Sequence, residues 1–509
     1  MVMRISGFAS GLDIDQIVSD LMKAERIPLT RLEQQRQLVQ WQREAYLAVN
    51  SQLLKLRNAA FDLKLSSALN LKQIDITGNA GAVSAKATGG AIDGVITVEV
   101  KQVATAARTI SDTLSWITDP VNDPNKPLAE LKDSNNNALW TGTYSITING
   151  VTITGDAGTD SLNTLLHKIN TSSAGVTAYY DAANKKISFT AKEAGWVNGP
   201  NRDGATITFD DGGSGFLGTV LGVDRINENL KNDAVTAAQK AVVTINGLES
   251  EQNTNTLTVN GITITLKAVG TATLTVRTDV DAVVAKIKAF VDTYNETLSL
   301  FQTKLTEKRY RDYLPLTEEQ KKEMTEEQIK LWEEKARSGL LRGDSVLQAL
   351  EQSLRSIATA VYNTGSSAVN SLASIGIRSL SYQDNGKLYV DEAKLRQAIE
   401  TDIEAVKKLF QQNGATEAEK GIAVRLYDRV AQAMKEVTRK AGSDPNVLDS
   451  SVLGWQLRDL NARISAWEQK LIDIENKYYR QFTAMEQAIS RYNMQAMFLA
   501  QRFGGGAQG

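Results

Sequence analysis

The residue types that most often carry chemistry in proteins are scarce in this sequence. Cysteine is absent, and His167 is the one histidine among 509 residues. The chain therefore has no disulfide, no thiol nucleophile and no thiolate metal ligand, and a single histidine cannot build a histidine-rich metal site. Neither a P-loop nor a Gly-x-Ser-x-Gly motif is present. We expect no enzyme activity, no metal and no cofactor.

Two acidic motifs could bind a partner or a cation. Arg342-Gly343-Asp344 has the form of an integrin-binding motif. However, Gly343 suits a turn and Asp344 is a preferred helix N-cap, so a structural role is favoured. The second motif, Asp210-Asp211-Gly212-Gly213, is acidic and rich in glycine, and it also favours a simple turn.

Composition narrows the classes of partner. The net charge is −2 and the isoelectric point is about 5.9, so no basic field attracts nucleic acid. No run of 18 apolar residues occurs, and we expect no membrane insertion. The segment from Met1 to Asp15 has one arginine and no apolar stretch, so we do not expect it to be a cleaved Sec signal peptide.

The stretch from Val452 to Phe503 carries two apolar rows with a spacing of seven residues. The first row is Leu457, Ile464, Leu471, Tyr478, Met485, Tyr492 and Leu499. The second is Leu453, Leu460, Trp467 and Ile474 and then, after one extra residue, Phe482, Ile489, Ala496 and Phe503. Such rows are typical of a coiled-coil seam, and a helix this long needs a partner to cover them.

The N-terminal residues supply a candidate partner. Residues 13–25 predict a short amphipathic helix with Asp13 as N-cap and one apolar face; that face is Ile14, Ile17, Val18, Leu21 and Met22. A second helix is predicted from Pro28 to about Ser66, with a seven-residue row of Leu32, Val39, Tyr46 and Leu53. The two ends of the chain would then form antiparallel helical legs.

The two halves of the C-terminal stretch are expected to have different partners. Its proximal half, to about Ile474, is predicted to pair with the 28–66 helix of its own chain. The distal half, after the one-residue slip at Gln481, mixes tyrosine and methionine, which are common at adaptable interfaces, and is predicted to face other subunits. A closed hairpin within one chain is the alternative.

The middle of the chain is predicted to be β-rich. From about Gln73 to Arg277 the sequence is rich in Thr, Val, Ile, Gly and Asn, and three Asn-Gly pairs, at 149, 246 and 260, indicate hairpin turns. The fold class is therefore an α+β multidomain protein with coiled-coil legs and two inserted β domains. The predicted partition is 1–45, N-terminal leg helices; 46–72, first part of a helical domain; 73–117 and 234–277, inner β domain; 118–233, outer β domain; 278–450, rest of the helical domain with a charged insert at 310–337; and 451–509, C-terminal leg.

Several segments together resemble the bacterial flagellar filament cap family, also called flagellar hook-associated protein 2 or FliD. The opening Ser10-Gly11-Leu12-Asp13-Ile14-Asp15-Gln16-Ile17-Val18 is similar to the start of that family. Residues 162–190 are similar to a small repeat of flagellins and cap proteins. Residues 279–295, 343–345 and 481–486 are similar to the family's C-terminal region.

The resemblance implies a non-enzymatic cap at the distal, extracellular tip of the filament. It implies a ring of five or six subunits that promotes the folding and insertion of exported flagellin and prevents its loss. It also implies contact with hook–filament junction proteins, and export through the flagellar type III apparatus with a chaperone and without a cleaved signal peptide. The expected oligomer or filament contacts are the seam residues Leu457, Ile464, Trp467, Leu471, Ile474, Tyr478, Phe482, Met485, Ile489, Tyr492 and Leu499, with Ile14, Ile17, Leu21, Leu32 and Val39.

Two other functions stay open at this point. One is a surface adhesin that uses the β domains, since cell adhesion is linked to some members of the family that this sequence resembles. The other is a β-rich enzyme such as a glycosidase. The β region holds few tryptophans (Trp116, Trp140 and Trp196), which disfavours the enzyme.

Overall fold

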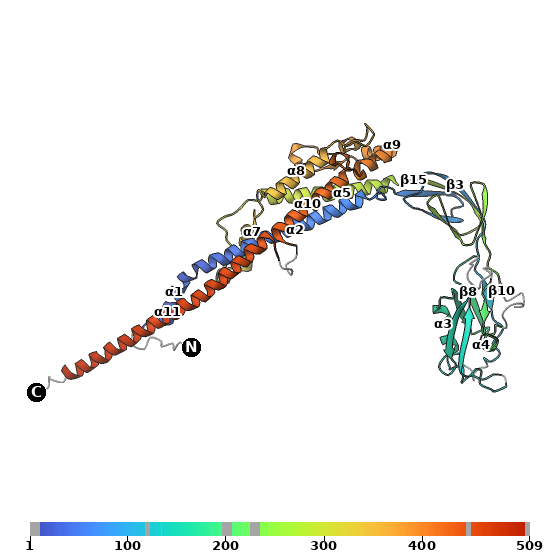
Figure 1. Cartoon of the computed structure of the whole chain (residues 1–509), viewed down its shortest axis with the longest axis horizontal. Helices are drawn as coiled ribbons and strands as arrows, with labels where there is room; N and C mark the ends of the chain where they lie inside the picture. Colours follow the sequence, from blue (N-terminus) through green and yellow to red (C-terminus); the bar gives the residue numbers. More distant parts are fainter. Residues whose placement is uncertain are drawn as a thin grey trace. The chain divides into compact units, whose positions relative to one another are not determined.

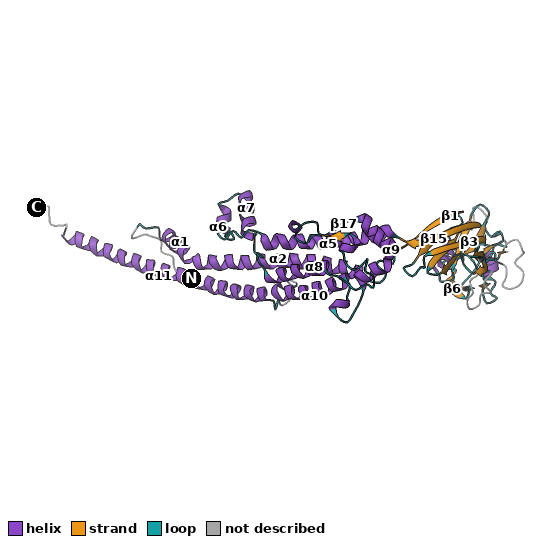
Figure 2. Cartoon of the chain, turned by 90° about the horizontal axis from the view of Figure 1, so that it is seen from above, coloured by secondary structure: helices purple, strands orange, loops and turns teal. Residues whose placement is uncertain are grey.

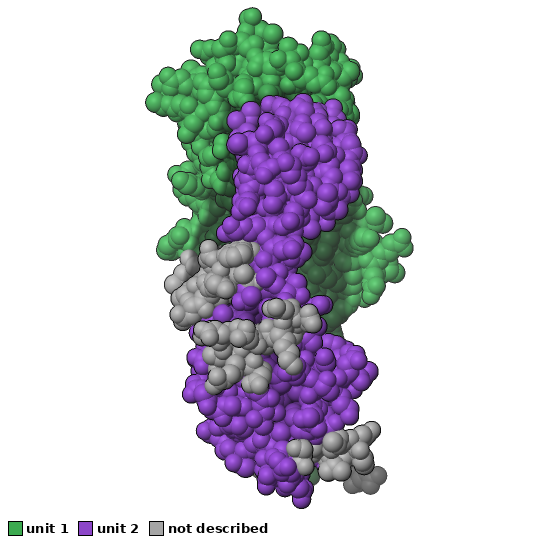
Figure 3. Space-filling model, turned by 90° about the vertical axis from the view of Figure 1, so that its right-hand side faces the viewer, with its two compact units in different colours: residues 1–69, 280–509 green, residues 70–279 purple. Residues whose placement is uncertain are grey.

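A computed structural model describes residues 11–117, 123–133, 135–195, 206–223, 235–443 and 449–503. The chain divides into two compact units, drawn in different colours in Figure 3. Unit 1 joins Met1–Leu69 to Val280–Gly509, and unit 2 is Asn70–Asp279. Helices and several separate sheets are both present (Figure 1), which confirms the predicted α+β multidomain class.

Unit 1 is mainly helical. Its longer helices are α1 (Ile14–Glu25), α2 (Ile27–Lys64), α5 (Val280–Thr306), α8 (Ser345–Thr359), α9 (Glu392–Gln411), α10 (Ile422–Ala441) and α11 (Val452–Phe503). The helices α1, α2 and α11 agree with the helices predicted at 13–25, 28–66 and 452–503 to within a few residues. Shorter elements are α6 (Glu318–Lys322), α7 (Glu326–Arg337), η1 (Ala373–Ile375), β16 (Ile377–Arg378), η2 (Tyr382–Asp384), β17 (Tyr389–Val390) and η3 (Glu417–Glu419).

The second half of α2 is the centre of a helical bundle. Tyr46, Val49, Leu53 and Leu56 are fully buried, at the alternating spacing of three and four residues that keeps side chains on one helix face. This face contacts α5 and α10, and Figure 2 shows α2, α5, α8 and α10 side by side. The first half of α2 leaves the bundle and becomes part of the leg.

The charged insert folds against α2. The two short helices of the insert, α6 and α7, each begin with a capping box, at Thr317 and Thr325. In each box the threonine side chain accepts a hydrogen bond from the backbone amide of a glutamine, and the side chain of that glutamine accepts one from the threonine amide. The Trp332 indole donates to the Leu314 carbonyl (2.8 Å) and its ring lies 4.6 Å from that of Tyr313. The insert is thus a folded element anchored by its tryptophan.

Unit 2 contains two separate hydrophobic cores. One lies between a five-stranded antiparallel sheet of order β1-β15-β3-β11-β12 and a three-stranded sheet of order β13-β14-β2. Its strands are β1 (Lys72–Gly78), β2 (Val83–Ala87), β3 (Gly94–Gln102), β11 (Ala241–Ile245), β12 (Leu248–Gln252), β13 (Thr256–Val259), β14 (Ile262–Leu266) and β15 (Gly270–Thr278). Lys72 of β1 is paired with Thr278 of β15, which brings the two ends of the unit together.

The other core is enclosed by sheets of order β10-β4-β8-β7 and β6-β5-β9 with two helices. The elements are β4 (Arg108–Ile110), β5 (Thr143–Ile148), β6 (Val151–Asp156), α3 (Leu162–Thr171), β7 (Val176–Asp181), β8 (Lys186–Ala191), β9 (Phe209–Asp210), α4 (Phe216–Leu221) and β10 (Val235–Thr236). The Asn170 side chain bonds both the amide and the carbonyl of Ala178 in the edge strand β7. This contact closes part of that edge.

The three hairpin turns predicted from Asn-Gly pairs are present in unit 2. Asn149, Asn246 and Asn260 all have positive φ angles and begin the turns β5–β6, β11–β12 and β13–β14, as the Asn-Gly pairs predicted. The short helix α3 begins at Leu162 with Ser161 as its N-cap. The carboxylate of Asp160, which precedes this helix, accepts hydrogen bonds from Tyr144 (2.7 Å) and Lys168 (2.6 Å). The predicted limits between inner and outer β domains stay a prediction.

Candidate functional site

The leg formed by α1, α2 and α11 is the candidate functional site. It begins where Arg43 of α2 pairs with Asp449 (2.9 Å) and also donates to the Ala441 carbonyl. Burial alone would raise the pKa of Asp449, but hydrogen bonds from Ser451 and the charge of Arg43 outweigh burial and lower it. The carboxylate therefore stays ionised and holds the start of α11 beside α2.

The first part of the α11 seam is covered by α2. Leu32 of α2 and Leu460 and Ile464 of α11 form a buried cluster, with Val39 and Trp467 partly buried beside it. This agrees with the predicted pairing of the proximal half with the 28–66 helix. Leu457 is half-buried here.

The next part of α11 is covered mainly by α1, with Leu29 of α2 at the edge of the contact. Ile14, Val18 and Met22 bury Leu471, and Ile474, Tyr478 and Phe482 are among the partly buried residues packed against them. Two tyrosines of α11 donate to carboxylates of α1: Tyr478 to Glu25 (3.1 Å) and Tyr479 to Asp15 (2.9 Å). The change of partner near Leu471 differs from the prediction, which gave the 28–66 helix the whole seam to Ile474.

The contact face of α1 is one part of the apolar face predicted for it, and it leaves out two of the predicted contacts. Ile14, Val18 and Met22 follow a spacing of four residues, whereas the predicted contacts Ile17 and Leu21 are half-buried and exposed, respectively. Both spacings lie on one broad helix face, and only the position of α11 selects between them. Leu21 therefore makes no part of the buried seam within the chain.

The end of α11 is exposed in the described part of the chain. Met485 and Ile489 are half-buried, and every side chain from Arg491 to Gln501 is exposed. Tyr492 is 71% and Leu499 is 52% exposed, and Met494, Met497 and Phe498 are exposed as well. Figure 1 shows α11 continuing past α1. We call residues 491–501 the bare segment.

The bare segment is apolar on more than one side. At about 100° per residue, Tyr492 and Leu499 lie on one face, and Met494 lies about 200° away from Tyr492 on the opposite face. A helix that is apolar around its whole circumference is normally buried in a core. The segment is therefore suited to be surrounded by several neighbours rather than covered by one helix.

The Arg-Gly-Asp motif lies at the root of the leg and is structural. Asp344 caps α8 through the amides of Val346 and Leu347, both at 3.1 Å. Its carboxylate, with 9% of the side chain exposed, also accepts a hydrogen bond from Tyr46 of α2 and one from Lys440 of α10 at 2.6 Å. Both oxygens of the carboxylate therefore accept hydrogen bonds from within the chain.

The electrostatics of this junction follow from its geometry. Burial alone would raise the pKa of Asp344, but hydrogen bonds from Lys440, Tyr46 and the Leu347 amide outweigh it and hold the pKa below its usual value. Burial, with the bond to Asp344, raises the pKa of Tyr46, whose hydroxyl stays a donor. Three segments of unit 1 are thus joined at one ionised carboxylate.

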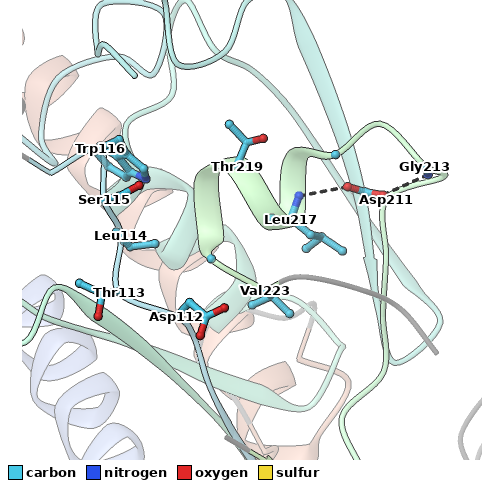
Figure 4. Close-up of a pocket in the computed structure, with 13 residues that line it drawn as sticks. Asp112, Thr113, Leu114, Ser115, Trp116, Asp211, Gly213, Leu217, Thr219 and Val223 are labelled. Carbon is cyan, nitrogen blue, oxygen red and sulfur yellow. Dashed lines mark hydrogen bonds between the residues drawn. The ribbon is translucent and has the colours of Figure 1, made fainter. Parts of the chain in front are cut away.

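The second acidic motif also proves structural. Asp211 accepts hydrogen bonds from the amides of Gly213 and Leu217, both at 3.0 Å, at the edge of a pocket beside α4 (Figure 4). Its partners account for both carboxylate oxygens. No group of three or more metal-binding side chains occurs within the described residues, and none of the helices described there could span a bilayer.

Comparisons with known proteins agree with the resemblance. Family models for the flagellar hook-associated protein 2 N-terminus and C-terminus match residues 10–107 and 238–494, and a flagellin hook IN motif matches residues 145–193. The flagellar hook-associated protein 2 of Halalkalibacterium halodurans is 33% identical, over 98% of this chain and 100% of its own length. That of Thermotoga maritima is 26% identical over 99% of this chain and 96% of its own length.

A solved structure supports the fold. The crystal structure of the D1-D2-D3 domains of the flagellar cap protein FliD from Escherichia coli matches with a TM-score of 0.53 and 22% identity. The match covers 82% of this chain and 99% of that one. With matches to both terminal family models and a relative that aligns over nearly its whole length, the chain belongs to the flagellar hook-associated protein 2 family, a structural family and not an enzyme family.

Proposed function

We propose that this chain is a cap at the distal end of the bacterial flagellar filament. The observation that carries the proposal is the bare segment of α11, which exposes Tyr492, Met497 and Leu499 at the tip of a leg whose root is fixed. Exposed apolar surface of this kind marks an interaction site. The matched Escherichia coli protein is a flagellar cap protein, which agrees with this use of the leg.

In this proposal the bare segment docks among helices at the filament end. The apolar side chains on its two faces would be buried by the helices of flagellin subunits and of neighbouring copies of this chain. The cap would promote the folding and insertion of exported flagellin and prevent its loss, with junction proteins and an export chaperone as further partners. Export by the flagellar type III apparatus to the filament tip belongs to the same proposal.

The docking role can be tested with charged substitutions in the bare segment. In a strain that lacks the gene, we expect the double variant Tyr492→Asp and Leu499→Asp to release flagellin into the medium and leave filaments short. Gln501→Asp adds a charge to an exposed polar position of the same segment and should cap normally. Normal filaments with the double variant would contradict the proposed contact.

The ring can be tested separately. We expect native mass spectrometry of the full chain to show pentamers or hexamers that weaken in the double variant. A monomer at all concentrations, in a chain that still caps filaments, would contradict the ring but not the docking role.

An adhesin remains a second function with less support. Asp344 of the Arg-Gly-Asp motif is buried and bonded, so the motif cannot present its carboxylate to a receptor. An adhesin would have to use the β-rich unit 2. Binding of purified chain to host cells that survives Asp344→Asn but is lost with a change in unit 2 would favour it.

A further inference from the structure

Five Asn-Gly pairs lie within the residues that the structure describes. They begin at Asn149, Asn246, Asn260, Asn385 and Asn413. In such a pair the backbone nitrogen of the glycine can attack the side-chain amide of the asparagine, because glycine has no side chain to hinder the approach and its backbone turns freely. The five pairs are held to different degrees, so the fold decides which of them reacts.

Two of the pairs have an asparagine side chain fixed by hydrogen bonds. The buried Asn149 side chain donates to the Ala174 carbonyl (2.9 Å) and accepts from the Thr208 amide (3.1 Å). The exposed Asn246 side chain accepts from the Thr97 amide at 2.9 Å. An attack on either side chain must first break these bonds, and at Asn149 it must also move a buried group.

Two further pairs have a fixed backbone. The Gly261 carbonyl, in the pair that begins at Asn260, accepts from the amide (2.9 Å) and the hydroxyl (2.8 Å) of Thr88. The Asn385 carbonyl accepts from the Gln302 side chain at 2.9 Å. Both asparagines have the positive φ of a tight turn. The turn must therefore open before the glycine nitrogen can approach the side chain.

The pair at Asn413 and Gly414 is the least restrained of the five. It lies between the end of α9 and η3, and the Asn413 side chain is exposed. Within the described residues neither Asn413 nor Gly414 makes a hydrogen bond, and Asn413 does not have the positive φ of the other four asparagines. A Cβ at Gly414 would lie 2.2 Å from the Glu419 Cβ, so packing requires glycine after this asparagine.

We propose that Asn413 is a site of spontaneous deamidation. The Gly414 nitrogen loses its proton and forms a bond to the Asn413 Cγ. The bond from Cγ to Nδ2 then breaks, and the released nitrogen takes up a proton and leaves as ammonia. Water opens the resulting cyclic imide at either of its two carbonyls and gives aspartate or isoaspartate. The reaction consumes one water, releases one ammonia and needs no oxidant or reductant.

The products change both the charge and the length of this loop. Each adds a negative charge to a loop that already carries Glu417 and Glu419. Isoaspartate also adds one atom to the backbone, just after Gln412, whose carbonyl accepts from the Gly421 amide at 2.7 Å. The modified chain must fit this extra atom between fixed ends.

Peptide mass spectrometry of the full-length chain, stored at neutral and at mildly alkaline pH, tests the proposal. Conversion of Asn413 should increase with time and with pH, because the attacking nitrogen must be deprotonated. It should be at least tenfold faster than conversion of the buried and bonded Asn149. In the chain unfolded by urea, the five pairs should react at similar rates, since only the fold distinguishes them.

Two variants decide whether Asn413 is responsible. Asn413→Gln keeps a side-chain amide but can close only a larger ring, so it should remove most of the isoaspartate formed by the folded chain. Asn246→Gly, which changes an exposed asparagine of another pair, is the matched control and should leave the isoaspartate at Asn413 unchanged. Conversion of Asn413 no faster than that of Asn149, or undiminished isoaspartate in Asn413→Gln, would overturn the proposal.

Discussion

The covered and the bare parts of α11 share one helix and one heptad pattern but differ in what surrounds them. From Leu460 to Leu471 the seam is buried by α2 and then by α1, and residues up to Phe482 are partly buried beside α1. From Arg491 to Gln501 the same pattern is exposed. The covered part uses mainly leucine and isoleucine at its buried positions, and the bare part uses tyrosine, methionine and phenylalanine. A heptad pattern therefore indicates that a helix has a partner, without indicating which partner it has.

The root of the leg, unlike its tip, is fixed by several contacts within the chain. Asp344 joins α2, α8 and α10, and the insert contacts α2 on its way out of the bundle: the Arg337 guanidinium lies 4.5 Å from the Trp41 ring, and Gln34 donates to the Pro315 carbonyl at 2.9 Å. We therefore expect the effect of a substitution on stability to depend on its place in the leg. An aspartate in the covered seam should cause a large loss of stability, and one in the bare segment should cause almost none.

Leu471→Asp should be the most damaging change in the leg. It places a charge among Ile14, Val18 and Met22 and should cost about 4 kcal/mol, enough to release α1 from α11. Hydrogen exchange of residues 14–25 measures the release. Ile472→Asp, on the exposed side of the same turn, is the control and should leave exchange unchanged. Slow exchange of α1 in Leu471→Asp would show that the seam does not hold it.

Asp344→Ala should weaken the root by about 3 kcal/mol, because it removes a helix cap and leaves Lys440 without its partner. Local opening of α8 and α10, measured by hydrogen exchange, reports this loss.

The same carboxylate predicts a pH dependence. The folded pKa of Asp344 is below its usual 3.8, so the unfolded chain binds more protons in the range just below pH 3.8. The stabilisation is complete above pH 3.8 and is lost as the pH falls through the folded pKa. Asp344→Asn keeps an N-cap but should remove this acid dependence. A root equally acid-sensitive in Asp344→Asn would assign the effect to another group.

Arg337→Ala should have a smaller effect, about 1 kcal/mol, because it removes the guanidinium that lies over Trp41. The expected signs are faster exchange in α7 and a change in tryptophan fluorescence. Arg342→Ala, an exposed arginine in the following loop, is the matched control. If both variants behaved alike, the insert would not brace α2 through this contact.

Leu499→Asp should change the stability of the isolated chain by less than about 0.5 kcal/mol, because the side chain is already exposed. Thermal unfolding of the isolated chain measures this. A marked destabilisation would mean that the bare segment is covered within the free chain.

The positions of the helices in the leg follow from the sequence more closely than their contacts do. Local rules predict the bounds of α11, the N-cap at Asp13 and the Asn-Gly turns. All three are present in the structure. Local rules could not choose between the 14-18-22 and 14-17-21 faces of α1, since both are apolar and only the position of α11 decides. The placement of the insert on α2 depends on contacts almost 300 residues apart, at Arg337 and Trp41.

We expect the bare segment to become buried only when the chain docks at the end of a filament. Hydrogen exchange of residues 491–501, compared between the isolated chain and the chain docked on flagellin filament ends, tests it most directly. We expect fast exchange in the isolated chain and at least tenfold slower exchange after docking, with little change in residues 457–474. Slow exchange before docking, or unchanged exchange in a chain that is docked, would show that the bare segment is not the docking surface.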